Sequence, residues 1–61
     1  MNNKWKLLAD EIVVWSGSHQ PSQNTINNAY ENASNRGWNG TRLEVTANDN
    51  FVCFVSSTVD A

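Results

Sequence analysis

The chain has few of the residues that small domains usually use for extra stability. It contains one cysteine, Cys53, and one histidine, His19, in 61 residues. A single cysteine excludes an internal disulfide and fits a reducing compartment, and the Cys/His cluster of a structural zinc site cannot be assembled. A domain of about sixty residues buries only about 60% of the surface of its unfolded chain. A partner, either a second copy or a foreign protein, is therefore the expected source of added stability.

Basic residues and long hydrophobic segments are also scarce. Four Lys and Arg stand against six Asp and Glu, for a net charge of −2, whereas nucleic-acid binding proteins carry a basic patch for the phosphates. The longest apolar run, Ile12 to Trp15, is far shorter than the ~20 residues that cross a membrane. No apolar segment of a signal peptide follows Met1 to Lys4. We therefore expect a soluble, cytoplasmic protein with no membrane partner, for which nucleic acid is a disfavoured partner.

No combination of residues predicts a catalytic or cofactor site. Cys53 lies in the most apolar segment, where a cysteine is usually a small buried hydrophobic residue, and His19 lies in a polar loop. A Cys–His nucleophile pair is therefore not expected. The adjacent carboxylates of Asp10-Glu11 lie at a predicted turn, where acids are usually solvated, and the glycines do not form a phosphate-binding loop. We expect a protein that is not an enzyme and that binds no metal or cofactor.

The first two apolar segments predict a β-hairpin. Trp5 to Ala9 and Ile12 to Trp15 are separated by Asp10-Glu11, and a two-residue turn would pair Ala9 with Ile12. Because Asp-Glu lacks the glycine that tight turns prefer, a single bent strand is the alternative. In the hairpin, the two faces alternate along each strand. One face would carry Trp5, Leu7, Ala9, Ile12 and Val14, and the other Lys6, Leu8, Val13 and Trp15.

A helix is predicted after a loop from Ser16 to Pro21. Ser22 is suited to the N-cap, because its hydroxyl can accept from the free amides of the first turn. The C-terminal end of the helix is indicated by Gly37, which can adopt the left-handed conformation of a C-cap, and by Trp38, which can fold back on the last turn. Residues at helical spacing define the face expected to pack on the sheet: Ile26, Ala29, Tyr30 and Ala33.

The last part of the chain predicts a second hairpin. Thr41 to Ala47 alternates between apolar and polar residues, and Phe51 to Val55 is apolar throughout, which is typical of a strand covered on both faces. Asn48-Asp49-Asn50 between them predicts a turn. A three-residue loop would place Phe51, Cys53 and Val55 on the face of Leu43 and Val45, and a two-residue loop would place Val52 and Phe54 there; the pattern leaves both registers open.

These elements combine into one α+β domain over residues 1–61, in the order β-β-α-β-β. The simplest arrangement is one antiparallel sheet with one helix on one face, and residues 56–61 are expected to form a flexible tail. Because the strands carry apolar residues on both faces, we expect an apolar sheet surface opposite the helix. Such surfaces are typical of interfaces, although the N-terminal segment or the tail is an alternative cover. With Trp15 as the anchor, the expected partner-binding residues are Lys6, Leu8, Val13, Trp15, Val52 and Phe54. The other register of the second hairpin would place Phe51, Cys53 and Val55 on this face in place of Val52 and Phe54.

The layout from Ala29 to Val55, under half of the chain, resembles that of small phage-encoded inhibitor proteins. It is similar to one anti-CRISPR family, in which a helix ends in a Gly-Thr turn and two strands follow, and to a phage inhibitor of host RNA polymerase. Here the turn would be Gly40-Thr41, followed by Arg42, Leu43 and Glu44. The resemblance implies an anti-defence or host-takeover protein that binds a bacterial complex. The anti-CRISPR family uses a lysine-rich face that this chain lacks, so its mode of contact does not carry over.

Three functions are consistent with these features. The first is a non-enzymatic protein-binding module that inhibits or regulates a larger intracellular protein by occupying its surface. The second is a homodimer or larger assembly that buries the same sheet face against its copy. The third is a single-stranded nucleic-acid binder that stacks bases on Trp15 and Phe54, and the scarcity of basic residues places it last.

Overall fold

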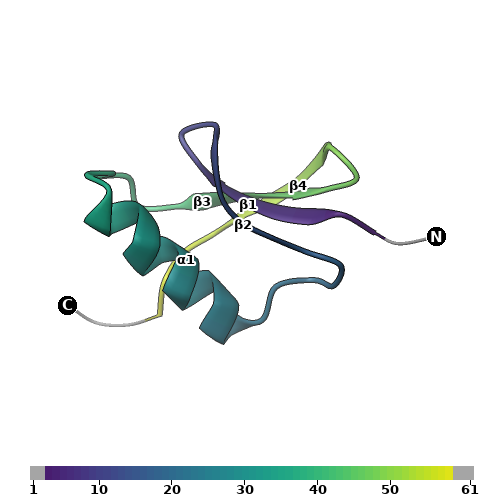
Figure 1. The fold of residues 1–61 in the computed structure, drawn as a ribbon, viewed down its shortest axis with the longest axis horizontal. Helices are drawn as coiled ribbons and strands as arrows, with labels where there is room; N and C mark the ends of the chain where they lie inside the picture. Colours follow the sequence, from purple (N-terminus) through teal and green to yellow (C-terminus); the bar gives the residue numbers. More distant parts are fainter. Residues whose placement is uncertain (1–2, 59–61) are drawn as a thin grey trace.

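Four antiparallel strands form one sheet, and a single helix lies against one of its faces (Figure 1). The computed structural model describes residues 3–58. The predicted fold class and element order are confirmed. In chain order, the elements are β1 (Trp5–Ala9), β2 (Ile12–Gly17), α1 (Gln23–Asn35), β3 (Leu43–Ala47) and β4 (Asn50–Val55).

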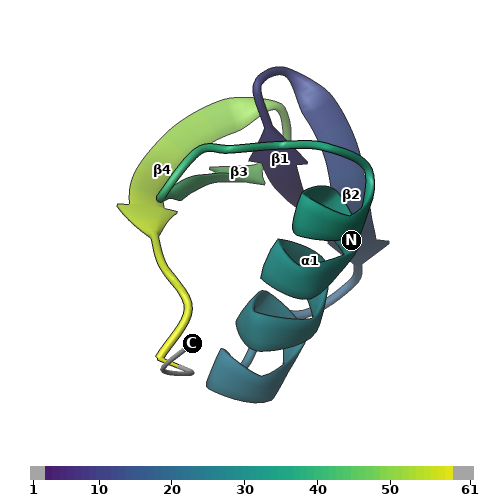
Figure 2. The same cartoon turned by 90° about the vertical axis from the view of Figure 1, so that its left-hand side faces the viewer.

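The helix covers only half of the sheet. The strand order is β2-β1-β3-β4, so β1 and β3 are central and β2 and β4 are the two edges. Contacts between α1 and the sheet fall mainly on β2 and β1, and Figure 2 shows β4 on the side of the sheet away from the helix. The prediction that Phe51 to Val55 is covered on both faces is therefore wrong, because β4 is an edge strand whose residues are mostly exposed.

Both hairpins close with a two-residue turn in which both residues have positive φ. The values are 50° and 72° at Asp10 and Glu11, and 53° and 67° at Asn48 and Asp49. Positive φ at both positions characterises the type I′ turn, whose twist matches that of the strands. The first hairpin thus forms without the usual glycine, and the single bent strand is excluded. At the second turn, Lys4 and Asn48 exchange hydrogen bonds: Lys4 N donates to Asn48 Oδ1 (3.0 Å) and Asn48 N to the Lys4 carbonyl (2.8 Å).

A β-bulge in the first hairpin changes the predicted faces. Near the turn the pairing is as predicted, with Leu8 opposite Val13, but Leu7 then pairs with Trp15 and leaves Val14 as the extra residue. Directly opposed residues of an antiparallel pair lie on the same face. Trp15 therefore lies on the helix-facing side with Leu7, and the prediction that it shares a face with Leu8 and Val13 is wrong.

The second hairpin also contains a β-bulge, and its pairing decides between the two predicted registers. Its turn has two residues, but Thr46 pairs with Phe51 and Val45 with Cys53, so Val52 is the extra residue of a second bulge. Beyond the bulge, Cys53 therefore lies on the face that the three-residue alternative predicted. Phe51 lies on the opposite face, as the two-residue alternative predicted. Each alternative was thus correct for one part of the strand.

The helix has well-defined ends. At its start, Ser22 Oγ accepts from the amide of Thr25 (3.3 Å). At its end, the amide of Trp38 donates to the carbonyl of Ala33 and that of Gly37 to Ser34, each at 3.0 Å. With Gly37 at a φ of 94°, this is the Schellman arrangement. It satisfies carbonyls of the last turn and brings Trp38 back against the helix.

The core lies between α1 and the two central strands. Leu7 and Leu43 are fully buried, and three of the four residues of the predicted helical face are buried, with Tyr30 half-buried. Trp38 packs edge-on against Tyr30, with ring centroids 5.2 Å apart. The buried core residues are Leu7, Ala9, Ile26, Ala29, Ala33, Leu43 and Val45.

The segment after β4 returns to the helix. Gln23 Nε2 donates to the Ser56 carbonyl (3.2 Å), and the amide of Thr58 donates to Asn27 Oδ1 (3.1 Å). Figure 2 shows this segment running from the end of β4 toward the start of α1. Residues 56–58 of the predicted tail are thus hydrogen-bonded to the helix, and residues 59–61 lie outside the described part of the chain.

Candidate protein-binding surface

The face of the sheet opposite the helix, here called the outer face, is built from two rows of side chains that run across all four strands. The cross-strand pairs place Val13, Leu8, Glu44 and Phe54 in one row. The adjacent row is defined by cross-strand pairs in the same way and contains Ser16, Lys6, Thr46 and Phe51.

Four of the six residues predicted to bind a partner share this outer face. Val13 and Phe54 are 45% and 52% exposed, whereas Leu8 is half-buried. Lys6 forms an ion pair with Asp49 across the sheet, with Nζ 3.4 Å from Oδ1. The predicted set is therefore grouped in space, but its exposed apolar members lie at the two edges of the sheet rather than at its centre.

The predicted anchor, Trp15, is not part of this surface. It is half-buried and packs against the core, with its indole folded over Gly17 so closely that a Cβ there would lie 2.6 Å from a ring atom. The bulge at Val14 is the physical reason, because it moves Trp15 to the helix-facing side. The structure thus gives Trp15 a packing role in place of the predicted exposed one.

The largest exposed apolar side chains outside the first hairpin gather on β4 and form what we call the β4 patch: Phe51, Val52, Phe54 and the neighbouring Arg42. Phe51, Val52 and Phe54 are 56%, 47% and 52% exposed. The two phenylalanine rings meet edge to face with centroids 5.1 Å apart, and the guanidinium carbon of Arg42 lies 5.0 Å from the Phe54 centroid. Exposed clusters of this kind are typical of interaction sites rather than of ordinary monomer surface.

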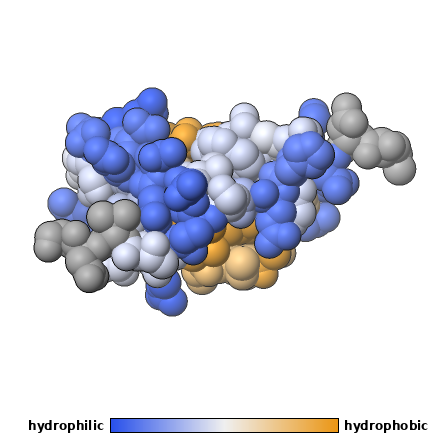
Figure 3. Space-filling model, turned by 90° about the horizontal axis from the view of Figure 1, so that it is seen from below, coloured by the Kyte–Doolittle hydropathy of each residue, from blue (hydrophilic) through white to orange (hydrophobic). Residues whose placement is uncertain are grey.

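Apolar surface is also exposed on the helix side of the molecule. In Figure 3 most of that side is hydrophilic, and hydrophobic surface gathers at the lower margin, on the β4 side of the sheet. Cys53 faces the helix side of β4, because it pairs with the core residue Val45, and it is exposed. Strand β4 therefore presents apolar side chains on both of its faces.

Arg42 was missing from the predicted residues, and Phe51 was predicted on this face only in the register that excluded Phe54. Phe51 lies three residues before Phe54, and in a regular strand residues three apart point to opposite faces. The bulge at Val52 puts both rings on the outer face. No alternation pattern could have shown this, although the run of apolar residues did indicate where the exposed strand lies.

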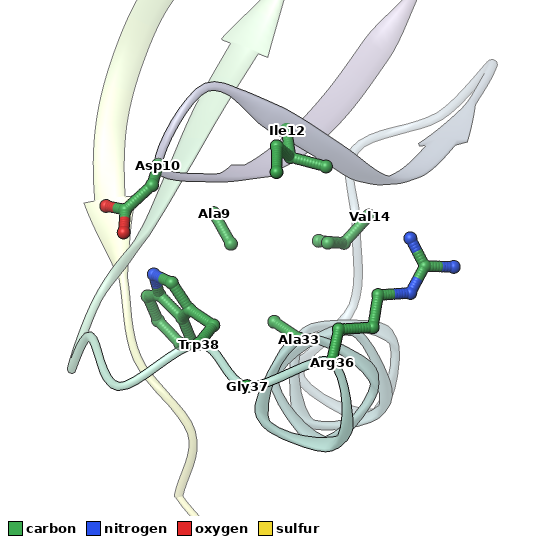
Figure 4. A pocket seen from close by; sticks show the side chains of 8 residues that line it. All are labelled: Ala9, Asp10, Ile12, Val14, Ala33, Arg36, Gly37 and Trp38. Atoms are coloured by element: carbon green, nitrogen blue, oxygen red, sulfur yellow. The ribbon is translucent and has the colours of Figure 1, made fainter.

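A second, smaller feature is an open cleft of about 220 Å³ between the first hairpin and the end of α1 (Figure 4). Ala9, Ile12 and Val14 line one side, and Ala33 and Trp38 line the other. Asp10 and Arg36 lie at opposite sides of the opening. The cleft lacks the convergent polar groups that orient a small ligand, so it is a weaker candidate site than the β4 patch.

Trp38 connects this cleft to the loop before β3. Its Nε1 is buried and has no hydrogen-bond partner, and a Cβ at Gly40 would lie 2.3 Å from the indole. The Tyr30 hydroxyl donates to the Gly40 carbonyl (3.3 Å). The loop backbone can cover the indole because Gly40 has no side chain, and a larger residue there would collide with the ring.

The residues capable of nucleophilic or metal chemistry are kept apart. Cys53 lies on one edge strand, and His19 follows the other edge strand by two residues. Within residues 3–58, no group of three or more His, Cys, Asp or Glu side chains is placed to hold a metal ion. The only helix in that range is too short and too polar to cross a membrane.

Comparisons of this chain with protein-family models, with curated proteins and with solved structures find no match.

Proposed function

We propose that this protein is a non-enzymatic protein-binding module that inhibits or regulates a larger intracellular protein by occupying its surface. The observation that carries this proposal is the β4 patch, in which two exposed phenylalanines of β4 pack edge to face and Arg42, just before β3, lies over one of them. Aromatic residues and arginine are the residue types enriched in binding hot spots.

The geometry of the patch favours binding because its side chains are already ordered. Phe51 and Phe54 pack against each other, and Arg42 is placed over Phe54, so less side-chain freedom is lost when a partner covers them. Fully burying a phenylalanine is worth about 1.5–3 kcal/mol, and each ring is already about half-buried. Covering both would supply about 2 kcal/mol, or roughly thirty-fold in affinity.

An inhibitory or regulatory role fits the small size and the absence of an assembled catalytic group among the described residues. The layout resemblance to phage-encoded inhibitors favours a bacterial host complex as the target. The contact would differ from the lysine-rich face of the anti-CRISPR family, because the basic member of the β4 patch is Arg42 alone. We therefore expect an apolar recess with an acidic or carbonyl-rich rim on the partner, which Arg42 would face.

Single-stranded nucleic acid fits the same surface less well. Phe51 and Phe54 are available to stack bases, but Glu44 lies beside Phe54 in its row and Asp49 engages Lys6. A phosphate backbone would meet these carboxylates together with a net charge of −2. Binding to single-stranded DNA that weakens steeply with salt would support this alternative.

The test compares partner capture by the full chain and by a patch variant. Phe54→Ser removes the ring at the centre of the patch from a position that is half exposed, so the fold should survive. Wild-type protein immobilised on beads should enrich a specific protein complex from a lysate of the source organism, and Phe54→Ser should lose it. Affinity for the purified partner should fall about fivefold or more, half of the free energy expected for both rings, as measured by calorimetry.

The matched control is Ile12→Ser. Ile12 is 61% exposed and is also an apolar edge-strand residue, but it lies in the first hairpin at the opposite edge of the sheet. This variant should bind the partner as tightly as wild type does. If Phe54→Ser keeps full affinity, or if both variants lose it equally, the β4 patch is not the binding site and the proposal fails.

A further inference from the structure

The outer edge of β4 is open to another strand. β4 is last in the strand order, and an edge strand presents a row of backbone donors and acceptors that pair readily with a further strand. Natural proteins commonly protect such edges with charged residues or proline. The stretch from Asn50 to Thr58 contains neither.

The other edge of the sheet is less accessible. The helix packs against β2, so a chain approaching that edge also meets α1, as the arrangement in Figure 2 makes visible. Each edge strand contains one bulge, at Val14 or Val52, in the third position after its turn. In β4 the bulge leaves Cys53 to Val55 as a regular edge that the helix does not cover.

We propose that the occupant of this edge is a second copy of the same chain, paired antiparallel through β4. Two-fold pairing is the commonest symmetry of protein oligomers, and it brings no like charges together along the two β4 strands because the strand has none. It would also supply the added stability expected for a domain of this length without a disulfide.

The charges that flank β4 are complementary under this symmetry. Asp49 lies immediately before β4, and its side chain remains 83% exposed while it pairs with Lys6. Arg42 lies at the other end of the hairpin, reaching over β4 to Phe54. Antiparallel pairing sets the Asp49 end of one copy against the Arg42 end of the other, and the two-fold axis repeats this arrangement. Each end of the strand pair thus carries an aspartate from one copy and an arginine from the other.

This proposal is distinct from the proposed function because it uses the backbone edge of β4 rather than the outer face. The two are compatible. Pairing through the edge would join two four-stranded sheets and place both copies' Phe51 and Phe54 side by side on one continuous outer face. A partner recognised by one patch would then meet two.

The test uses opposite charges at Cys53, which is exposed in the single chain and lies near the middle of β4. Wild type should show concentration-dependent dimerisation by sedimentation equilibrium between about 10 µM and 1 mM, the range expected for a small interface. Cys53→Lys and Cys53→Glu should each weaken dimerisation at least tenfold, since equal charges meet near the axis. An equimolar mixture of the two should restore the dimer, and neutral Cys53→Ser should behave like wild type.

The outcomes separate the two proposals. A wild type that stays monomeric up to about 1 mM, or a Cys53→Lys variant that dimerises as wild type does, overturns the edge pairing. Circular dichroism of each variant shows whether it is folded, and a variant that unfolds is replaced by Arg42→Glu, which should also weaken the dimer. Capture of a foreign partner that depends on Phe54 can persist in a strictly monomeric protein, in which case only the edge pairing fails.

Discussion

The two hairpins of this protein have the same construction and opposite surroundings. Each has a two-residue turn with positive φ at both positions, two paired residues after it, and then a single extra valine, Val14 or Val52. In the first hairpin, the residue after the bulge, Trp15, packs on the core. In the second, the residue after the bulge, Cys53, is exposed.

The difference comes from the helix and not from the strands. The helix packs on β1 and β2 and leaves β4 uncovered, so apolar residues of similar type become core in one edge strand and surface in the other. The hydrophobicity of a strand therefore does not by itself indicate how deeply it is buried. Where apolar residues remain exposed after the helix has been placed, they mark the candidate binding surface.

The largest expected effects concern the inner strands, where the two hairpins should behave alike. Leu7→Ala and Leu43→Ala each truncate a fully buried side chain and should lower the free energy of unfolding by about 2–5 kcal/mol. This is comparable with the roughly 3–5 kcal/mol that a domain of this size holds in total. In urea titrations followed by circular dichroism, both variants should already be largely unfolded before urea is added. A well-folded Leu43→Ala variant would show that the second hairpin contributes little to the core.

Substitutions in the edge strands should then lower the free energy of unfolding by different amounts in the two hairpins. Trp15→Ala removes a half-buried ring that packs on the core and should cost about 2 kcal/mol. Phe54→Ala removes an exposed ring and should cost less than about 1 kcal/mol. The order of the two stability losses is checked by comparing the urea midpoints of the variants, with one common dependence of the unfolding free energy on urea concentration. Equal losses would mean that the Phe54 ring is covered in solution.

The smallest effects concern the polar contacts on the outer face. Arg42→Ala loses its position over Phe54 and should cost about 0.5–1 kcal/mol. Lys6→Ala loses an exposed ion pair with Asp49 and should cost about 0.2–1 kcal/mol. Repeating the titrations at high salt should remove the effect of Lys6→Ala and retain part of that of Arg42→Ala, because screening acts most on exposed pairs. A salt-independent Lys6→Ala effect would indicate a packing role for the lysine stem.

Much of the fold followed from local chemistry. Ser22 and Gly37 define the helix ends through capping, and helical spacing gives the face that carries Ala29 and Ala33. The element order follows from the turn residues between alternating segments. These features depend on neighbours along the chain, which is why a sequence read alone can predict them.

The candidate site was harder to predict because it depends on distant elements. An extra residue such as Val52 looks the same in sequence whether it is bulged or regularly paired. The exposure of β4 is set by the place of α1 across the sheet. The prediction therefore identified Phe54 and Val52 among the surface residues, offered Phe51 only as their alternative, placed Trp15 on the wrong face, and omitted Arg42.

The bulged valines have a consequence for how this chain would be aligned with related ones. Without Val14 and Val52, both hairpins would still pair every remaining residue with its present partner, because each valine is an insertion into an otherwise regular ladder. A relative shorter by one residue at either position would keep the same residues on the buried and exposed faces of the sheet. A one-residue gap placed elsewhere in the same strands would instead exchange core for surface. Length variation at these two sites is therefore the kind that this fold can tolerate.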